Sequence, residues 1–318
     1  MSTPRADFLR WSRIMAAVCV WTVATTGLLC YGGTLPAVAQ WIGHVQFLPA
    51  AMAFSVSIIV IWLIVTLVFG RVYCSVACPL GIYQDICSRV PRLGRVSSSR
   101  HYHYSPALTV WRTVTLTLVV VAILLGITSV IVLADPWSIY TRACHDLGQP
   151  VVISLRSLWE VPAVRVASAS AAGVACSAVT MLVITYMAVR NGRTFCNSIC
   201  PIGTSLGYVS RYSIMHIDIN TDLCTQCRRC EHVCKASCID LVSHVVDGSR
   251  CVTCFDCLTV CPDDAIRYTW ERHQLSIPMM QKIGPLTAPG TQCSGTEAAN
   301  CVRDGINKHV KETKHSEI

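Results

Sequence analysis

Two short phrases of almost the same sequence stand far apart in this chain. Residues 70–81 read GRVYCSVACPLG, and residues 192–203 read GRTFCNSICPIG. Each phrase directly follows a long apolar run and places two cysteines before a proline. The similarity continues, because a Ser-Arg pair stands at the same spacing beyond each phrase, at residues 88–89 and 210–211. A repeat of this kind predicts two related structural units rather than one.

Four apolar runs are long enough to cross a bilayer, which takes about 20 residues of helix. The chain is 53% hydrophobic and only 14% charged, whereas soluble domains carry about 25% charged residues. Burial of all four runs inside a large soluble protein is the alternative, and the low charge disfavours it. We therefore expect an all-α membrane bundle of four transmembrane helices, two in each repeat, at residues 14–31, 47–70, 113–134 and 166–189.

The arginines predict which helix ends face the cytoplasm, because positive residues concentrate on that side of a membrane. Three arginines precede the first apolar run and six lie between the second and the third, while residues 32–46 contain no Lys or Arg. Both termini are therefore expected in the cytoplasm, with residues 1–13 as the N-terminal segment and residues 271–318 as a tail. This clustering accounts for the net charge of +8 without a nucleic-acid partner.

Repeats with an even number of spans are parallel, so a pseudo-twofold axis along the membrane normal would relate them. Such an axis would bring Cys74 and Cys78 toward Cys196 and Cys200 at the inner ends of the helices. Four thiolates suit an iron–sulfur cubane, and we favour a shared metal centre there. A pair of redox-active dithiols, tetrahedral zinc and cysteines that only pack are the alternatives.

Two longer cysteine runs follow the repeats. Residues 224–234 read CTQCRRCEHVC and residues 251–261 read CVTCFDCLTVC. In the spacing C-x2-C-x2-C-x3-C, three thiolates bind one [4Fe–4S] cluster and the fourth cysteine binds the other cluster. We therefore expect an α+β ferredoxin domain with two clusters at residues 212–270, after a membrane domain at 14–211. One cluster would be held by Cys224, Cys227, Cys230 and Cys261, and the other by Cys251, Cys254, Cys257 and Cys234.

The first of these runs departs from the second at two positions. Lys235 stands where Pro262 follows the second run, and Cys238 adds a thiol four residues after Cys234. Cys238 could be a spare or competing ligand, and we take it to be a packing residue.

The combination of four spans, two C-x3-C-P phrases and a C-terminal pair of cubane motifs resembles the membrane polyferredoxins of the NapH/NosR type over residues 10–270. The resemblance implies a 4Fe–4S quinol dehydrogenase component of the bacterial cytoplasmic membrane, which passes electrons from quinol toward a partner reductase. It carries over to the four C-x3-C-P cysteines and the eight ferredoxin cysteines. The periplasmic flavin-binding domain of the NosR type has no counterpart here. Other relatives reduce copper during oxidase assembly, so the resemblance defines electron transfer better than the acceptor.

A quinone site needs an amphiphilic slot and a proton acceptor. The third connection reads LADPWSIYTRACHDLG, in which Asp135 could accept a proton and Trp137 suits the interfacial aromatic belt. His145 and His44 are further proton partners, and a simple helix stop at Asp135 is the alternative. A hydrocarbon core of about 30 Å is too thick for one efficient electron transfer from an outer quinol to an inner cluster. The quinone site must therefore lie deeper, or a partner must bridge the gap.

We thus expect a membrane iron–sulfur protein that moves electrons between the quinone pool and a redox partner protein. A metal reductase or assembly factor that uses the C-x3-C-P cysteines to reduce copper is the second hypothesis. A transporter or sensor that merely carries clusters is the third.

Overall fold

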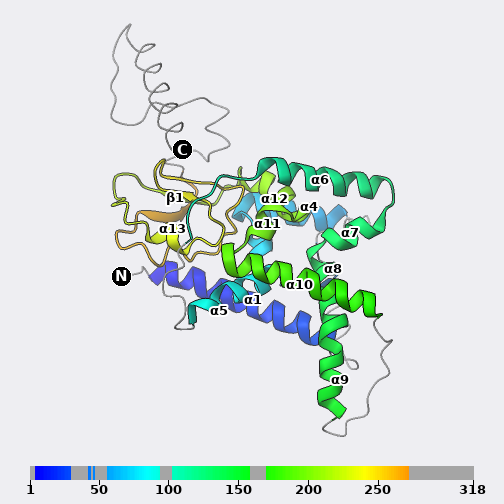
Figure 1. Cartoon of the computed structure of the whole chain (residues 1–318). Coiled ribbons are helices and arrows are strands. Elements are labelled where there is room, and N and C mark those ends of the chain that lie inside the picture. The colour runs from blue at the N-terminus through cyan, green and yellow to red at the C-terminus, as the bar shows by residue number, and fades with distance from the viewer. Residues whose placement is uncertain are drawn as a thin grey trace, which may run out of the picture. The chain divides into compact units, whose positions relative to one another are not determined.

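The computed structural model of the chain describes residues 4–29, 42–43, 46, 56–93, 102–157 and 170–271. All of them belong to one compact unit, Met1–Ser276. Figure 1 shows the small strand-containing part at one end of the long helices α1 (Pro4–Leu29) and α10 (Ala171–Asn191). The helices α7 (Thr128–Ala134), α8 (Pro136–Ala143) and α9 (Gln149–Ser157) lie at the other end.

The first helix begins at Pro4, before the apolar run and before the expected start of the membrane span at residue 14. Pro4 occupies the first helical position and Asp7 the first turn, and both residue types are favourable there. The basic segment is therefore helical and packs on the C-terminal part of the chain. Its arginines bind buried carboxylates, because Arg10 Nε lies 3.1 Å from Asp256 Oδ1 and Arg13 Nη1 lies 3.3 Å from Asp85 Oδ2.

Among the described residues, α1 and α10 are the two helices long and apolar enough to cross a membrane. Only 22% and 17% of their apolar windows are buried, so neither is the enclosed core helix of a soluble protein. Two shorter apolar helices, α4 (Val56–Phe69) and α6 (Thr109–Leu124), also carry exposed large apolar side chains such as Ile61 and Leu118. Residues 30–41, 47–55 and 158–169, which contain parts of three expected spans, lie outside the described residues.

The third apolar run forms two helices rather than the single span expected at residues 113–134. Helix α6 ends at Leu124, and α7 begins at Thr128. Between them Gly126 has φ +70°, and the Ile127 N–H donates to the Ala122 carbonyl at 2.8 Å. A glycine in the left-handed region is a common way to end a helix. The helix therefore ends near Gly126, although the apolar composition continues through it.

The two repeated units have corresponding elements. The first contains α4, the π-helical turn η1 (Tyr73–Ala77) and α5 (Pro79–Leu93), and the second contains α10, α11 (Thr194–Ser198) and α12 (Pro201–Ser210). The apolar helix of each unit ends at a glycine with positive φ, Gly70 at +79° and Gly192 at +67°. Helix α5 packs against α10, and α12 packs against α4. Each unit therefore supports the apolar helix of the other, as two halves related by a twofold axis would.

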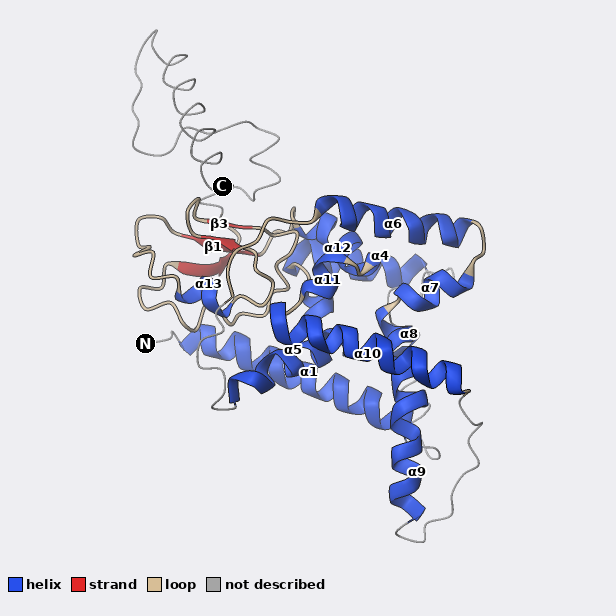
Figure 2. Cartoon of the chain, viewed as in Figure 1, coloured by secondary structure: helices blue, strands red, loops and turns tan. Residues whose placement is uncertain are grey.

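The C-terminal part is a small α+β structure (Figure 2). Strand β1 (His216–Ile219) pairs antiparallel with β4 (Ile266–Thr269), and β2 (Ile239–Asp240) pairs antiparallel with β3 (Val245–Val246). The short helix α13 (Arg229–Val233) precedes β2. Two backbone bonds attach this part to the end of α4, from Ile214 N–H to Leu67 O and from Met215 N–H to Val68 O, each 2.8 Å long.

Candidate metal centres

The four cysteines of the two C-x3-C-P phrases lie together in one buried core. Cys74 belongs to η1, Cys78 follows it, Cys196 belongs to α11, and Cys200 caps α12. Each is only 3–4% exposed, and all four belong to the same cluster of packed side chains. The structure therefore brings together the cysteines of two phrases that are distant in sequence.

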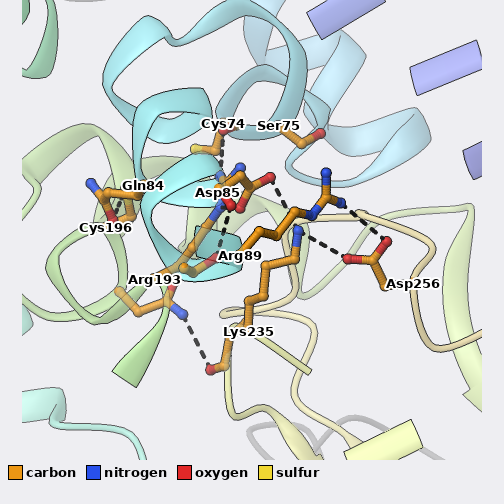
Figure 3. A network of polar contacts seen from close by, with 12 residues as sticks. Cys74, Ser75, Gln84, Asp85, Arg89, Arg193, Cys196, Lys235 and Asp256 are labelled. Carbon is orange, nitrogen blue, oxygen red and sulfur yellow. Dashed lines mark hydrogen bonds and ion pairs between the residues drawn. The ribbon is translucent and has the colours of Figure 1, made fainter. Parts of the chain in front are cut away.

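Two buried arginines cross between the phrases. Arg71, from the first phrase, donates from Nη2 to the carbonyl oxygen of Cys196 at 3.4 Å. Arg193, from the second phrase, donates from Nη1 to the carbonyl oxygen of Cys74 (Figure 3). Both guanidinium groups are fully buried. Each phrase thus holds the first cysteine turn of the other in place.

The glycine that closes each phrase lies against the cysteine carbonyl that accepts from the opposite arginine, and only glycine leaves room there. A Cβ atom at Gly81 would collide with the carbonyl oxygen of Cys74, and a Cβ atom at Gly203 would collide with that of Cys196. The opposite arginine lies beside each glycine as well. Any larger residue would displace the cysteine turn.

Several buried donors around these cysteines have no acceptor. Arg71 Nε, Arg193 Nη2 and Gln84 Nε2 are buried without a hydrogen-bond partner, although Gln84 Oε1 accepts from Cys196 Sγ at 3.6 Å. Among the described residues, Arg71 forms no ion pair with a carboxylate. A buried charge needs a compensating partner, and an unpaired buried donor costs about 1–3 kcal/mol. The pattern therefore fits an anionic group held by the four thiolates, and a [4Fe–4S] cluster bound by four cysteines is such a group.

The burial and placement of these cysteines bear on what they could hold. All four thiols are buried, whereas reactive dithiols need access to their partners. Within the described ranges, no three His, Cys, Asp or Glu side chains are placed to hold a single metal ion. Zinc draws all its thiolates to one ion at about 2.3 Å, whereas the thiolates of a cubane bind different irons.

The eight ferredoxin cysteines line two cavities, in the grouping that their spacing predicts. The assignment of these residues as cluster ligands stays a prediction, but the donor sets fit it. The first cavity is lined by Cys224, Cys227, Cys230 and Cys261. The second is lined by Cys234, Cys251, Cys254 and Cys257, together with Cys238.

The two cysteine runs have the same backbone conformation, although Lys235 stands in the first where the second has a proline. Left-handed φ values occur at Gln226 and Thr253, which precede the second cysteine of each run, and at Arg228 and Phe255, which follow it. Backbone in such turns can direct successive N–H groups toward an anion. The loss of the proline therefore does not change the course of the first run.

The three cysteine sites follow one another through packed side chains. Val252 and Cys254, at the second cavity, pack in the same core as the four C-x3-C-P cysteines. Cys230 of the first cavity shares another core with Cys234 and Cys257 of the second. The second cavity thus lies between the C-x3-C-P site and the first cavity, an order that the sequence does not reveal.

Lys235 forms a buried ion network between the helical bundle and the ferredoxin part (Figure 3). Its Nζ lies 3.2 Å from Asp85 Oδ2 and 2.9 Å from Asp256 Oδ2. Arg193 Nε donates to Asp85 Oδ1 at 2.8 Å. Burial alone would raise the pKa of Asp85, but Arg193, Lys235 and Arg13 hold it well below its usual range. The sequence did not single out Asp85. The signal that could have led to it was Lys235, which stands where the second run has a proline and which, if buried, needs an acidic partner.

The expected quinone residues have clear local roles. Asp135 caps α8, because its Oδ2 accepts from the Ser138 N–H at 2.8 Å and from the Ser138 hydroxyl at 2.7 Å. Its Oδ1 is buried without a partner. The Trp137 ring lies against Gly43 of the first connection. His145 pairs with Asp146 at 3.1 Å, and His44 lies outside the described residues.

The first connection also reaches the cysteine site. Tyr73 donates from its hydroxyl to Gln46 Oε1 at 2.6 Å, and Gln46 Nε2 donates to the Ala77 carbonyl at 3.2 Å. Ile139 and Tyr140 of α8 belong to the same core as the four cysteines. Residues of the first connection and of α8 therefore pack around the cysteine site, and its expected position at the inner ends of the helices stays a prediction.

A family model described as a 4Fe-4S binding domain matches residues 51–96 and 175–219. Each matched segment contains one C-x3-C-P phrase, and the two longer cysteine runs lie outside both. No solved structure matches the chain.

Two uncharacterised proteins of Methanocaldococcus jannaschii are similar to short parts of the chain. One is 31% identical over 75 residues, which is 24% of this chain and 30% of the relative. The other is 28% identical over 76 residues, which is 24% of this chain and 31% of the relative. The chain thus spans under a third of the length of these relatives.

Two ferredoxin-type proteins are similar over most of the chain. The ferredoxin-type protein NapH of Escherichia coli is 26% identical over 235 residues, covering 71% of this chain and 70% of the relative. The methylamine utilization ferredoxin-type protein MauN of Paracoccus denitrificans is 25% identical over 210 residues, covering 66% and 64%. With the 4Fe-4S match on both cysteine phrases, these similarities confirm the resemblance to NapH-type polyferredoxins that was drawn from the sequence.

Proposed function

We propose that this protein moves single electrons across its length between the quinone pool and a redox partner, through three [4Fe–4S] sites. Clusters of this type, when bound, supply one-electron transfer. The observation that carries the proposal is the buried site of Cys74, Cys78, Cys196 and Cys200. Its unpartnered donors fit a bound anion, and Cys254 of the next site packs against the same core.

The surrounding residues keep this site dry and rigid. The four cysteines are 3–4% exposed, so water and soluble oxidants have little access. Arg71 and Arg193 add positive charge from opposite phrases, which favours the more negative, reduced state of a bound group. The same burial argues against the copper-reducing alternative, since a copper ion or a partner thiol could not reach these cysteines.

The first ferredoxin cavity is the proposed exit to the partner. Cys227, Arg228 and Arg229 are exposed there, whereas the cysteines of the C-x3-C-P site are buried. Exposed positive charge beside a redox site attracts a negatively charged protein surface. We therefore expect the partner to present acidic residues to this end of the molecule.

The quinone end is proposed at the junction of the first and third connections. Trp137 contacts Gly43 there, and Asp135 has one buried oxygen free to bind a proton. Side chains of α8 reach from this junction into the core that holds the four cysteines. This packing supports an electron path from the junction to the four cysteines, in place of a separate carrier across about 30 Å of bilayer.

The membrane assignment follows from the apolar helices. Four described helices expose large apolar side chains, which water would not tolerate over such an area. We infer a multi-pass protein of the bacterial cytoplasmic membrane, with both termini and the ferredoxin part in the cytoplasm. In this orientation the arginine-rich ends lie inside, as the positive-inside rule requires.

Quinol oxidation by the purified protein tests this function. The full chain is prepared anaerobically in lipid nanodiscs, mixed with a short-chain quinol, and frozen for electron paramagnetic resonance. We expect signals of reduced [4Fe–4S] clusters that are absent without quinol. Protein that contains its full iron complement, is reduced by dithionite, and yet gives no signal with any quinol would contradict the quinone assignment.

A further inference from the structure

The second ferredoxin cavity contains one more cysteine than a cubane needs. Cys238 lines it together with Cys234, Cys251, Cys254 and Cys257. Cys238 is 1% exposed, and its Sγ lies 3.5 Å from that of Cys234. Cys251 lines the same cavity. A fifth thiol therefore faces the same space as the four expected ligands.

The first cavity supplies the comparison. Ala265 stands four residues after Cys261, as Cys238 stands four residues after Cys234. Ala265 lines the first cavity, and its N–H donates to Cys261 Sγ at 3.3 Å. The N–H of Cys238 donates to the Cys234 sulfur in the same way. The two residues hold equivalent places, and only the second cavity has a thiol there.

We propose that Cys238 is an alternative ligand of the second [4Fe–4S] cluster and can take the place of Cys234. The inference rests on the proposed function, because it requires a cluster in this cavity. The exchange is a ligand substitution without oxidation or reduction. The bond from iron to the Cys234 sulfur breaks and a bond from the same iron to the Cys238 sulfur forms. The proton of Cys238 passes to Cys234 across their contact.

This exchange would make one ligand of the second site replaceable. The second site lies between the other two, so its loss would interrupt the whole electron path. In the first cavity Ala265 offers no sulfur, and the loss of Cys261 should remove that cluster. The difference between the two cavities supplies a matched control within the same chain.

The test compares iron content and electron paramagnetic resonance of anaerobically purified full-length variants. We expect Cys234→Ala to keep the iron content of the unaltered protein, with an altered signal from the second cluster. Cys234→Ala combined with Cys238→Ala should lose about four irons per chain, the content of one cubane. Cys261→Ala, the matched control, should lose about four irons as a single substitution.

A Cys234→Ala protein that keeps the signal of the first cluster but loses as much iron as the double variant would overturn the proposal. The proposed function would remain, since the unaltered protein would still contain its clusters. If Cys234→Ala does not accumulate, Cys261→Ala combined with Ala265→Cys decides. Recovery of the lost iron supports the proposal, and no recovery overturns it.

Discussion

At the scale of single residues, the ion network around Lys235 connects two parts of the chain that the sequence treats as separate domains. The cysteine sites could be predicted, because ligand spacing is a local pattern. The partners of Lys235 could not, because Asp85 and Asp256 reach it only through the tertiary fold. The domain boundary expected between residues 211 and 212 falls inside one compact unit. The division into two domains stays a prediction.

Replacement of Asp85 tests this network. Asp85→Asn leaves Arg193 buried without its carboxylate and leaves Lys235 paired with Asp256 alone, so we expect a loss of about 3–5 kcal/mol in the free energy of unfolding. The pKa of Asp85 is depressed in the folded state, so its contribution is complete above the unfolded pKa of about 3.9 and declines only below it. The loss should therefore be constant from pH 8 to pH 5 in denaturant titrations followed by circular dichroism.

Asp264→Asn is the control for that experiment. Asp264 forms an exposed ion pair with Arg267, with side chains that are 42% and 56% exposed. Such pairs contribute about 0–1 kcal/mol. A cost of Asp85→Asn that vanished between pH 7 and pH 5, or that matched the control, would show that the buried network does not stabilise the fold.

The second prediction at this scale concerns Asp135. Asn is as good a helix cap as Asp, so Asp135→Asn should keep α8 in place while it removes the proton acceptor. We expect quinol-dependent cluster reduction to slow by a factor of about 100 or more, measured by rapid mixing. Reduction by dithionite should be unchanged. If quinol reduces the variant at the full rate, the quinone site is not at Asp135.

At the scale of elements, the sequence predicted the repeat but not the way in which each repeated unit packs on the apolar helix of the other. The phrases predicted corresponding turns, and the structure has them, with glycines at the ends of α4 and α10. Helix α5 packs on α10, and α12 packs on α4. Both contacts join segments that are distant in sequence, so a local pattern does not predict them. The break at Gly126 was missed because apolar composition does not distinguish one long helix from two short ones.

Substitution of Gly203, which lies between the Cys196 turn and Arg71 of the other phrase, tests how the two units fit together. Gly203→Ala would push a Cβ atom into the carbonyl of Cys196 and displace the cysteine turn. We expect a loss of about four irons per chain, measured by iron analysis, with the ferredoxin signals retained. Gly126→Ala is the control, since it has positive φ but no atom within 4 Å of the new Cβ. It should cost about 1–2 kcal/mol of stability without loss of iron.

At the scale of the whole molecule, the cysteine sites follow one another from the C-x3-C-P core to an exposed basic end. The sequence predicted the ferredoxin part and the apolar helices, since cysteine spacing and hydrophobic runs are strong signals. It did not predict the order of the sites, because Cys254 approaches the C-x3-C-P core only in the folded chain. That core also contacts Gln46 of the first connection through Tyr73, another contact between distant segments that the sequence did not predict.

Charge at the exposed end should control the exit of electrons. Arg228→Glu with Arg229→Glu should slow oxidation of the reduced protein by the anion ferricyanide by about tenfold or more at low ionic strength. The difference should shrink as salt screens the charges, as measured by stopped-flow absorbance. Arg267→Glu, an exposed site with its own acidic partner, is the control. Equal rates in all three proteins would place the exit elsewhere.

The central claim is that the two C-x3-C-P phrases hold a cluster of their own, in addition to the two of the ferredoxin part. Iron and sulfide analysis of the anaerobically purified chain tests it directly, with Cys74→Ala and Cys196→Ala combined as the variant. The account predicts about twelve irons per chain for the unaltered protein and about eight for the variant, at four irons per cubane. About eight irons per chain in both proteins would contradict it.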